Sequence, residues 1–240
     1  MLKVWTYWEG PMPPYISICL ASIKRCCSDF DYNHVTPETI GQFIPKDQLP
    51  SDGLCPAIRC DVIRASLLAR FGGLYVDADT VFIRSPRGRV EADVDLLYAV
   101  WRKLPRRVLN GYVYARPGSL LAQEWYEQIK KKLAMGRHGW AELGERTLTP
   151  LVDSGLYCTQ LMPREVFLPI DVDADRQKLF AVADWLDYVK PCTIAFGLNH
   201  SWMMQNHTHT MNLPAEEMAK SDSLICRLLT DAANGVVVEC

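Results

Sequence analysis

The segment of residues 56–83 constrains the fold more than any other part of the chain. Residues 56–71 carry the apolar spacing of a helix, and Gly72-Gly73 follow where a helix can close in the left-handed conformation. Two short apolar runs, 74–76 and 80–83, then read as strands on either side of Asp77-Ala78-Asp79. A helix that leads at once into strand is typical of a sheet covered by helices.

The rest of the chain repeats this alternation without an internal repeat or a low-complexity linker. We therefore predict a single α/β domain over residues 1–240, with helices on the faces of the sheet. Further strands are predicted at 3–8, 31–35, 96–101, 111–115 and 193–196, and helices at about 14–27, from Thr36-Pro37-Glu38 onward, at 119–133 and at 216–232.

Composition limits the possible partners and compartments. The chain has 26 Lys and Arg against 28 Asp and Glu, so its net charge of −2 gives no overall field that attracts nucleic acid, and any partner must be recognised locally. Nine cysteines without a CxxC pair fit a reducing compartment. The first residues do not resemble a signal peptide, and no apolar run is long enough to span a membrane. We expect a cytoplasmic protein with no transmembrane segment.

Asp77 and Asp79 are the strongest candidates for chemistry. Five Asp-x-Asp patterns occur in the chain, so the spacing alone carries no information, but only this pair is enclosed by apolar runs on both sides. Residues two apart on a strand share a face, so both carboxylates can converge at the end of the sheet. Two such charges repel by about 4 kcal/mol at 4 Å and an effective dielectric near 20, unless a cation intervenes. Carboxylate oxygens favour Mg²⁺ or Mn²⁺.

Asp61 and Arg64 lie three residues apart on the preceding helix and therefore share a face. That helix leads through the glycine pair into the acidic segment, so both side chains can overlook the same site. The alternative is a local Asp61–Arg64 ion pair beside a solvent-exposed acidic turn.

The segment CDVIRASLLARFGGLYVDADT resembles the signature of capsular-polysaccharide-synthesis-type sugar transferases in the glycosyltransferase family 32 group. The opening KVWTYWEGPMPPYISICLASIKR is similar to the first strand and helix of these enzymes, and together the two matches span about residues 3 to 84. The resemblance implies a GT-A fold, which is a Rossmann-like mixed sheet flanked by helices. It also implies a donor-binding part over about 1–115 and an acceptor-side part over about 116–240.

The same resemblance implies roles for individual residues. Trp5, with Thr6 and Tyr7 beside it, would contact the nucleotide base. Asp61 and Arg64 would hold sugar hydroxyls and phosphate, and Tyr75 would line the donor pocket. Asp77 would contact ribose, sugar or metal-bound water, whereas Asp79 would bind Mn²⁺ or Mg²⁺ directly. The residues taken as catalytic are Asp77, Asp79 and Arg64.

A second motif, FGLNHSWMM, is similar to the late element of this family that closes over the diphosphate. Asn199, His200 and Ser201 are adjacent candidates to face the metal, and the sequence does not choose among them. We take Asn199 and His200 as metal ligands, and Ser201 and Trp202 as donor-binding residues.

The sequence thus predicts a metal-dependent glycosyltransferase for surface polysaccharide synthesis. The donor would be a UDP- or GDP-sugar, the acceptor a saccharide or lipid-linked saccharide, and the transfer would retain the anomeric configuration. The basic cluster 102–107 would give any peripheral contact with a lipid-linked acceptor, although a solvated loop is the simpler reading. Two alternatives stay open: a nucleotidyltransferase that holds two metals around a triphosphate, and a non-catalytic module that binds Ca²⁺ and saccharide.

Overall fold

The computed structural model describes residues 1–90, 92–102, 107–170 and 175–238. They form two compact units, each built from three separate stretches of chain. Unit 1 contains residues 1–9, 30–76 and 90–162, and unit 2 contains residues 10–29, 77–89 and 163–240. Both units draw on both halves of the chain. The single domain with a donor-binding part over about 1–115 and an acceptor-side part over about 116–240 stays a prediction.

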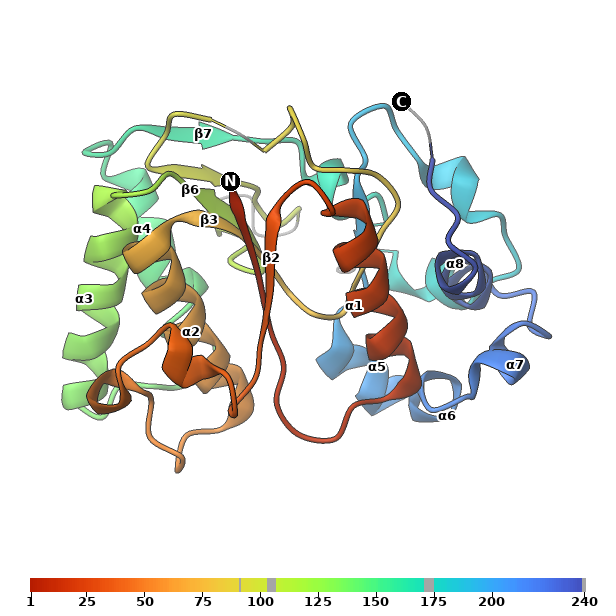
Figure 1. Cartoon of the computed structure of the whole chain (residues 1–240), viewed down its shortest axis with the longest axis horizontal. Coiled ribbons are helices and arrows are strands. Elements are labelled where there is room, and N and C mark those ends of the chain that lie inside the picture. Colours follow the sequence, from red (N-terminus) through yellow and green to blue (C-terminus); the bar gives the residue numbers. More distant parts are fainter. Residues whose placement is uncertain (91, 103–106, 171–174, 239–240) are drawn as a thin grey trace. The chain divides into compact units, whose positions relative to one another are not determined.

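Unit 1 is built on a mixed six-stranded sheet with the strand order β2-β1-β3-β6-β5-β7 (Figure 1). Strand β1 is parallel to both β2 and β3, β6 is antiparallel to both β3 and β5, and β5 is parallel to β7. The predicted mixed α/β class is therefore confirmed. The strands are β1 (Lys3–Tyr7), β2 (Asp31–Val35), β3 (Gly73–Val76), β5 (Leu96–Tyr98), β6 (Tyr112–Ala115) and β7 (Thr159–Leu161).

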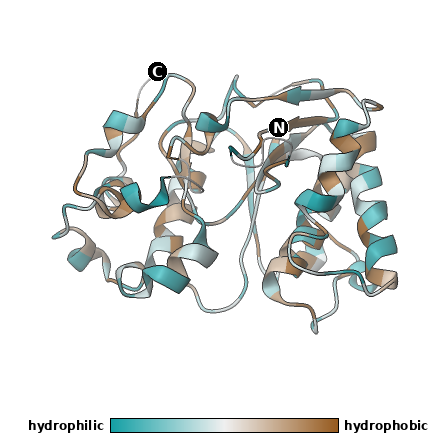
Figure 2. Ribbon diagram, turned by 180° about the vertical axis from the view of Figure 1, so that it is seen from behind, coloured by the Kyte–Doolittle hydropathy of each residue, from teal (hydrophilic) through white to brown (hydrophobic). Residues whose placement is uncertain are grey.

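Unit 1 has three helices among its described residues: α2 (Pro56–Phe71), α3 (Leu120–Ala134) and α4 (Glu145–Asp153). Helix α2 packs on β1, β3 and β6, and α3 packs against both α2 and α4. Figure 2 shows hydrophobic and hydrophilic residues alternating along α2 and α3, as expected of helices that bury one face. Ser119 caps α3, because its hydroxyl accepts from the N–H of Ala122 at 3.0 Å. Two short 3₁₀ turns complete the unit, η1 (Ile40–Gln42) and η2 (Lys46–Gln48).

The glycine pair after α2 is required by the backbone. Gly72 has a φ of +65° and Gly73 a φ of +104°, a region that favours glycine. A Cβ on Gly73 would lie 2.5 Å from the carbonyl oxygen of Lys3. The pair therefore lets the chain turn from α2 directly into β3 beside β1.

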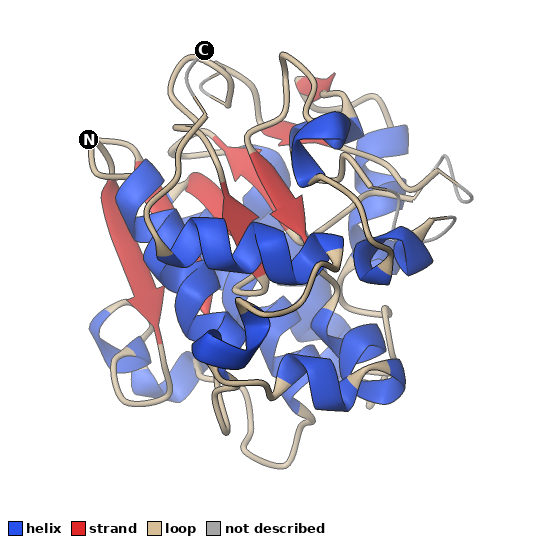
Figure 3. Ribbon diagram, turned by 90° about the vertical axis from the view of Figure 1, so that its right-hand side faces the viewer, coloured by secondary structure: helices blue, strands red, loops and turns tan. Residues whose placement is uncertain are grey.

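Unit 2 contains the short antiparallel pair β4 (Thr80–Phe82) and β8 (Ala195–Gly197), together with helices (Figure 3). Helix α1 (Pro14–Cys26) packs on β4, where the Ser22 hydroxyl accepts from the N–H of Phe82 at 2.9 Å. Helix α8 (Leu224–Ala233) packs on α1. The remaining elements are α5 (His200–Asn206), α6 (Thr208–Met211), α7 (Ala215–Met218), η3 (Arg164–Val166), η4 (Arg176–Phe180) and η5 (Trp185–Tyr188). Across the described residues, no helix combines the length and the apolar character needed to cross a lipid bilayer.

Three predicted elements are wrong in extent. The helix expected from Thr36 is a turn followed by the three residues of η1, because the Thr36 hydroxyl donates to Glu38 and Pro45 soon interrupts the chain. The helix predicted over 216–232 is divided into α7 and α8 by a serine-rich turn. The strand predicted over 96–101 ends at Tyr98. Elements α4, β7 and α5 were not predicted from the sequence.

Candidate functional site

The predicted site residues belong to both units. Unit 1 carries Trp5, Thr6, Tyr7, Asp61, Arg64 and Tyr75, and unit 2 carries Asp77, Asp79, Asn199, His200, Ser201 and Trp202.

In unit 1, Asp61 and Arg64 form a buried ion pair on α2. Arg64 Nη1 donates to Asp61 Oδ1 at 2.7 Å, and Arg64 is only 4% exposed. The Arg64 guanidinium also lies over the ring of Tyr75, with Cζ 4.6 Å from the ring centroid. The pair is therefore held by packing as well as by charge, unlike a solvated surface ion pair.

Tyr75 belongs to β3, and its ring contacts the Arg64 guanidinium of the Asp61–Arg64 pair. Its side chain is fully buried, and its hydroxyl lies 3.2 Å from the Sγ of Cys60. On the sheet, Tyr75 is in register with Trp5 of β1 and with Val113 of β6. A rigid aromatic ring at this point restricts the orientation of the Arg64 guanidinium.

Asp61 has a second partner that the sequence analysis missed. Asn110 Nδ2 donates to Asp61 Oδ1 at 2.7 Å, so the same oxygen accepts from both Asn110 and Arg64. The backbone of Gly144 lies against this group: a Cβ on Gly144 would lie 2.2 Å from Asn110 Nδ2 and within 3 Å of both Asp61 oxygens. The sequence signal was the dipeptide Asn110-Gly111, which is more typical of a turn.

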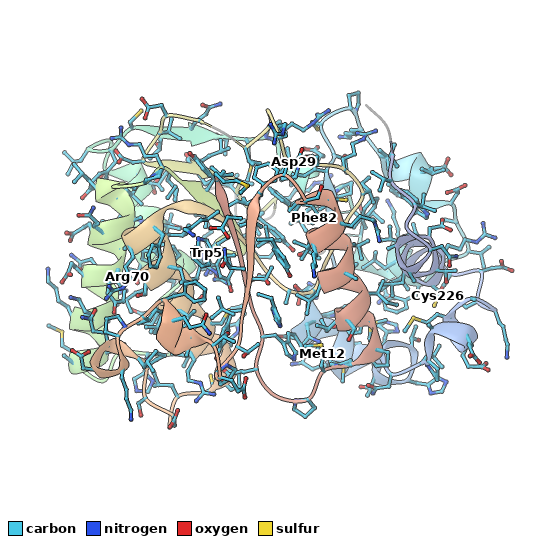
Figure 4. The ribbon with its side chains drawn as sticks, viewed as in Figure 1. Trp5, Met12, Asp29, Arg70, Phe82 and Cys226 are labelled. Carbon is cyan, nitrogen blue, oxygen red and sulfur yellow. The ribbon has the colours of Figure 1, made fainter. Side chains whose placement is uncertain are left out.

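The end of β1 is buried in this structure. Trp5 is fully buried (Figure 4); its Nε1 donates to the carbonyl of Gly72 at 2.9 Å, and its ring packs against Phe43 and Phe71. A contact between Trp5 and a nucleotide base would require this packing to open, so that role stays a prediction.

The two neighbours of Trp5 are also largely enclosed. Thr6 Oγ1 lies 3.2 Å from Nδ1 of His34 and 3.3 Å from the Tyr32 hydroxyl. Burial raises the pKa of Tyr7 to about 12, although the nearby Arg59 cation opposes this shift. Both side chains are therefore neutral hydrogen-bonding groups at neutral pH.

In unit 2, Asp77 and Asp79 lie in a bend rather than on a strand. The Asp77 carbonyl accepts from the Thr80 hydroxyl at 2.7 Å, which closes the bend just before β4. The alternation of strand side chains therefore does not orient the two carboxylates, and that part of the sequence argument is wrong. Asp79 is 9% exposed and its main-chain oxygen accepts from the N–H of Leu198 at 3.0 Å.

The carboxylate of Asp79 contacts the predicted late motif. Its Oδ2 accepts from the main-chain N–H of His200, the first residue of α5. Asn199 precedes it with a φ of +59°, and the Asn199 Oδ1 accepts from the N–H of Trp202 at 3.2 Å. Asp79 and the Asn199-His200 segment are thus brought together within unit 2.

The side chains of His200, Ser201 and Trp202 complete the late motif. The Nδ1 of His200 forms a hydrogen bond with the Tyr15 hydroxyl of α1, and burial lowers the pKa of His200. Ser201 is exposed. The ring of Trp202 lies under the guanidinium of Arg176, with Cζ 4.8 Å from the ring centroid.

The chemistry of these side chains fits a hard divalent cation. Asp79 carries carboxylate oxygens and Asn199 an amide oxygen, which are ligands that Mn²⁺ and Mg²⁺ favour, whereas the imidazole of His200 suits a transition metal better than Mg²⁺. In this structure Asn199 Oδ1 accepts from the N–H of Trp202, and His200 Nδ1 forms a hydrogen bond with the Tyr15 hydroxyl. Among the described residues, no group of three or more His, Cys, Asp or Glu side chains could hold a metal by itself. A cation bound through one or two carboxylates usually completes its coordination with water and substrate phosphates.

Residues 1–102 match the family model described as capsular polysaccharide synthesis protein. This match confirms the predicted family resemblance over the part of the chain that carries both early motifs. The predicted class of enzyme, a glycosyltransferase, is the class of that family. No curated protein sequence matches the chain.

Three solved structures are similar in part. The PaToxG glycosyltransferase is 11% identical with a TM-score of 0.47, over 65% of this chain and 69% of that chain. The galactosyltransferase LgtC, in complex with donor and acceptor sugar analogues, is 10% identical with a TM-score of 0.48, over 100% of this chain and 98% of that chain. A Bacillus anthracis protein assigned as a glucose-1-phosphate thymidylyltransferase, in complex with sucrose, is 13% identical with a TM-score of 0.36, over 68% and 87%.

Proposed function

We propose that this chain is a metal-dependent glycosyltransferase of GT-A fold that transfers a sugar from a UDP- or GDP-sugar to a saccharide or lipid-linked saccharide in surface polysaccharide synthesis. The observation that carries the proposal is the family match over residues 1–102, which includes Asp61, Arg64, Tyr75, Asp77 and Asp79. The geometry of these residues supports it in both units.

In unit 1, the buried Asp61–Arg64 pair would bind the donor. The planar guanidinium of Arg64 matches phosphate and sugar hydroxyls in a way that lysine could not. Because its terminal nitrogens donate to Asp61 and to Cys60 Sγ, it would reach the donor only when this packing opens. Asp61 would accept from a sugar hydroxyl while Asn110 and Arg64 fix its other oxygen. A preorganised pair of this kind loses little conformational entropy when the donor binds.

In unit 2, Asp79 would hold the cation, with Asp77, Asn199 and His200 as the other proposed ligands. A bound Mn²⁺ or Mg²⁺ would neutralise the charge that develops on the departing nucleoside diphosphate. The His200 N–H fixes one oxygen of the Asp79 carboxylate. Its imidazole is neutral at neutral pH because burial lowers the pKa of His200, so it would add no charge next to the acids.

The remaining predicted residues would enclose the donor. Trp202, whose ring is covered by Arg176, would lie beside the leaving phosphate with Ser201, and Trp5, Thr6 and Tyr7 would serve the base. Exclusion of water by aromatic rings favours transfer over hydrolysis, because water competes with the saccharide as acceptor.

Melting temperature under a donor screen tests the proposal. UDP- and GDP-sugars are added with and without Mn²⁺, and a ligand that binds only the folded state raises the melting temperature. We expect a rise with one donor that requires Mn²⁺, together with release of the nucleoside diphosphate. Release of pyrophosphate from a nucleoside triphosphate would instead identify a nucleotidyltransferase, and binding without any turnover would identify a saccharide-binding module.

Retention of anomeric configuration is a separate part of the proposal. The anomeric proton coupling of the newly formed glycosidic bond, measured by NMR, distinguishes the two outcomes. A product of inverted configuration would contradict retention and leave the transferase assignment intact.

A further inference from the structure

Residues 130–141, KKKLAMGRHGWA, form a basic segment of unit 1. In a chain with a net charge of −2, these twelve residues contain Lys130, Lys131, Lys132 and Arg137 and no acidic residue. They cover the last turns of α3 and the loop that follows. We call them the basic–aromatic loop.

Two large apolar side chains of the loop are exposed. Trp140 is 77% exposed and Met135 is 70% exposed. Tryptophan has the largest apolar surface of any side chain, so an exposed Trp140 leaves a large apolar area in contact with water. Lys131 and Arg137 are also exposed. Three of the four cations have an acidic partner next to the segment: Lys130 pairs with Glu127, and both Lys132 and Arg137 pair with Glu142.

The loop that exposes Trp140 and Met135 is held in place by hydrogen bonds. Just after α3 ends, Gly136 has a φ of +68°, and its N–H donates to the carbonyl of Leu133. At its end, Lys132 Nζ donates to the side chain of Glu142 at 2.9 Å and to its carbonyl at 3.2 Å. The buried Trp125 indole fixes the next carbonyl, that of Leu143, at 2.9 Å. The loop is therefore tied to α3 at both ends.

We propose that the basic–aromatic loop docks on an anionic lipid bilayer. Tryptophan prefers the boundary between headgroups and acyl chains, where its ring is apolar and its N–H is hydrated. Lysine and arginine next to it gain about 1 kcal/mol each at an anionic membrane surface. Charge complementarity therefore favours an anionic bilayer. The exposed side chains of Trp140 and Met135 can insert below the headgroups, which cations alone do not do. This surface differs from the basic cluster 102–107, which the sequence analysis considered for lipid contact; within that cluster, residues 103–106 lie outside the described part of the chain.

Vesicle sedimentation of the full chain without donor tests the docking. The probes are vesicles of phosphatidylcholine with about 30 mol% phosphatidylglycerol, so that about one lipid in three is anionic. Vesicles of pure phosphatidylcholine are the neutral control. We expect binding only to the anionic vesicles. Binding should be largely lost on going from about 0.1 M to about 1 M salt, because the Debye length shortens from about 10 to about 3 Å.

Two variants locate the contact, each with a matched control. Trp140→Ala should weaken vesicle binding about tenfold, whereas Leu156→Ala should not, although Leu156 is 81% exposed, because no cation lies within residues 151–161. The double variant Lys131→Gln with Arg137→Gln should weaken it about tenfold or more. Lys46→Gln with Lys220→Gln removes the same charge from other exposed positions and should change binding far less.

Tryptophan fluorescence gives an independent readout. The parent should show a blue shift when anionic vesicles are added, and Trp140→Ala should lose that shift. Equal binding to neutral vesicles, or equal effects of Trp140→Ala and Leu156→Ala, would overturn the proposal. Binding to heparin without binding to vesicles would also overturn it, and would identify an anionic polymer as the partner. None of these results depends on donor turnover, so the proposed enzyme function is tested separately.

Discussion

Asn110 Nδ2 donates to Oδ1 of Asp61 at 2.7 Å, and the same oxygen accepts from Arg64. This contact joins the turn before β6 to helix α2, so the orientation of the Asp61 carboxylate depends on both elements. Arg64 belongs to the same helix as Asp61 and could follow its movements. Asn110 cannot, and it therefore fixes the carboxylate relative to the sheet.

Replacement of Asn110 by Ala should lower the free energy of unfolding by about 1.5 kcal/mol, because a hydrogen bond to a charged and largely buried carboxylate is lost. Asn110→Asp should cost more, since it places a second carboxylate within contact distance of Asp61. Urea denaturation of the three proteins measures both changes. If Asn110→Asp were as stable as the parent, the contact would not exist in solution.

Gly144 should tolerate no side chain. A Cβ there would lie 2.2 Å from Asn110 Nδ2 and 2.8 Å from Asp61 Oδ2, so Gly144→Ala must displace both groups. We expect a loss of about 1–3 kcal/mol in the free energy of unfolding and weaker donor binding. The matched control is Gly41→Ala, because a Cβ on Gly41 meets no atom within 4 Å. A similar effect of the two substitutions would show that the close approach has no importance.

Asp79→Asn should abolish Mn²⁺ binding while the fold is retained. The amide keeps an oxygen that can accept from the His200 N–H, but it removes the negative charge that attracts the cation. We expect Mn²⁺ affinity in the presence of nucleoside diphosphate to fall by at least about 100-fold, measured by electron paramagnetic resonance of free Mn²⁺. Asp29→Asn, an exposed acid of the same unit that pairs with Arg87, is the control. Unchanged affinity in Asp79→Asn would remove the proposed metal site.

Local sequence patterns predicted most of the fold. Strand 31–35 and helix 56–71 were predicted with the bounds that β2 and α2 have, because a period of two or of 3.6 and clear end signals act within a few residues. The helix predicted from Thr36 is wrong because it too was inferred from local signals alone. Its hydroxyl, proline and acid matched a helix start, but a turn offers the Thr36 hydroxyl a partner in Glu38 and the apolar run ends at Pro45.

The candidate site was less accessible from sequence. Asp61 and Arg64 are three residues apart, so a helical period alone predicts their contact. The contact of Asp61 with Asn110 joins residues 49 positions apart, and nothing in the neighbourhood of Asn110 distinguishes it from a turn residue. Nor can an aromatic residue at a strand end be assigned to a ligand or to the core without the packing around it, as Trp5 illustrates.

His34 gives the protein a pH dependence that can be tested without substrate. It lies on β2 beside Thr6, and burial lowers its pKa below the ordinary value of 6.5. The unfolded chain therefore takes up a proton at His34 before the folded chain does. The stability that His34 contributes is fully present above pH 6.5 and is lost as the pH falls through the folded-state pKa.

We expect acidification from pH 7.5 to pH 5.5 to lower the free energy of unfolding less in His34→Gln than in the parent. This range covers about one unit on either side of the ordinary histidine pKa. Glutamine keeps a polar group beside Thr6 but does not titrate. Urea denaturation at both pH values measures the difference, and comparison with His209→Gln, which replaces an exposed histidine, isolates the contribution of burial. If the parent and His34→Gln lost the same free energy on acidification, His34 would not be held neutral by its place between β1 and the solvent, and the packing of β2 against β1 would be looser than the structure has it.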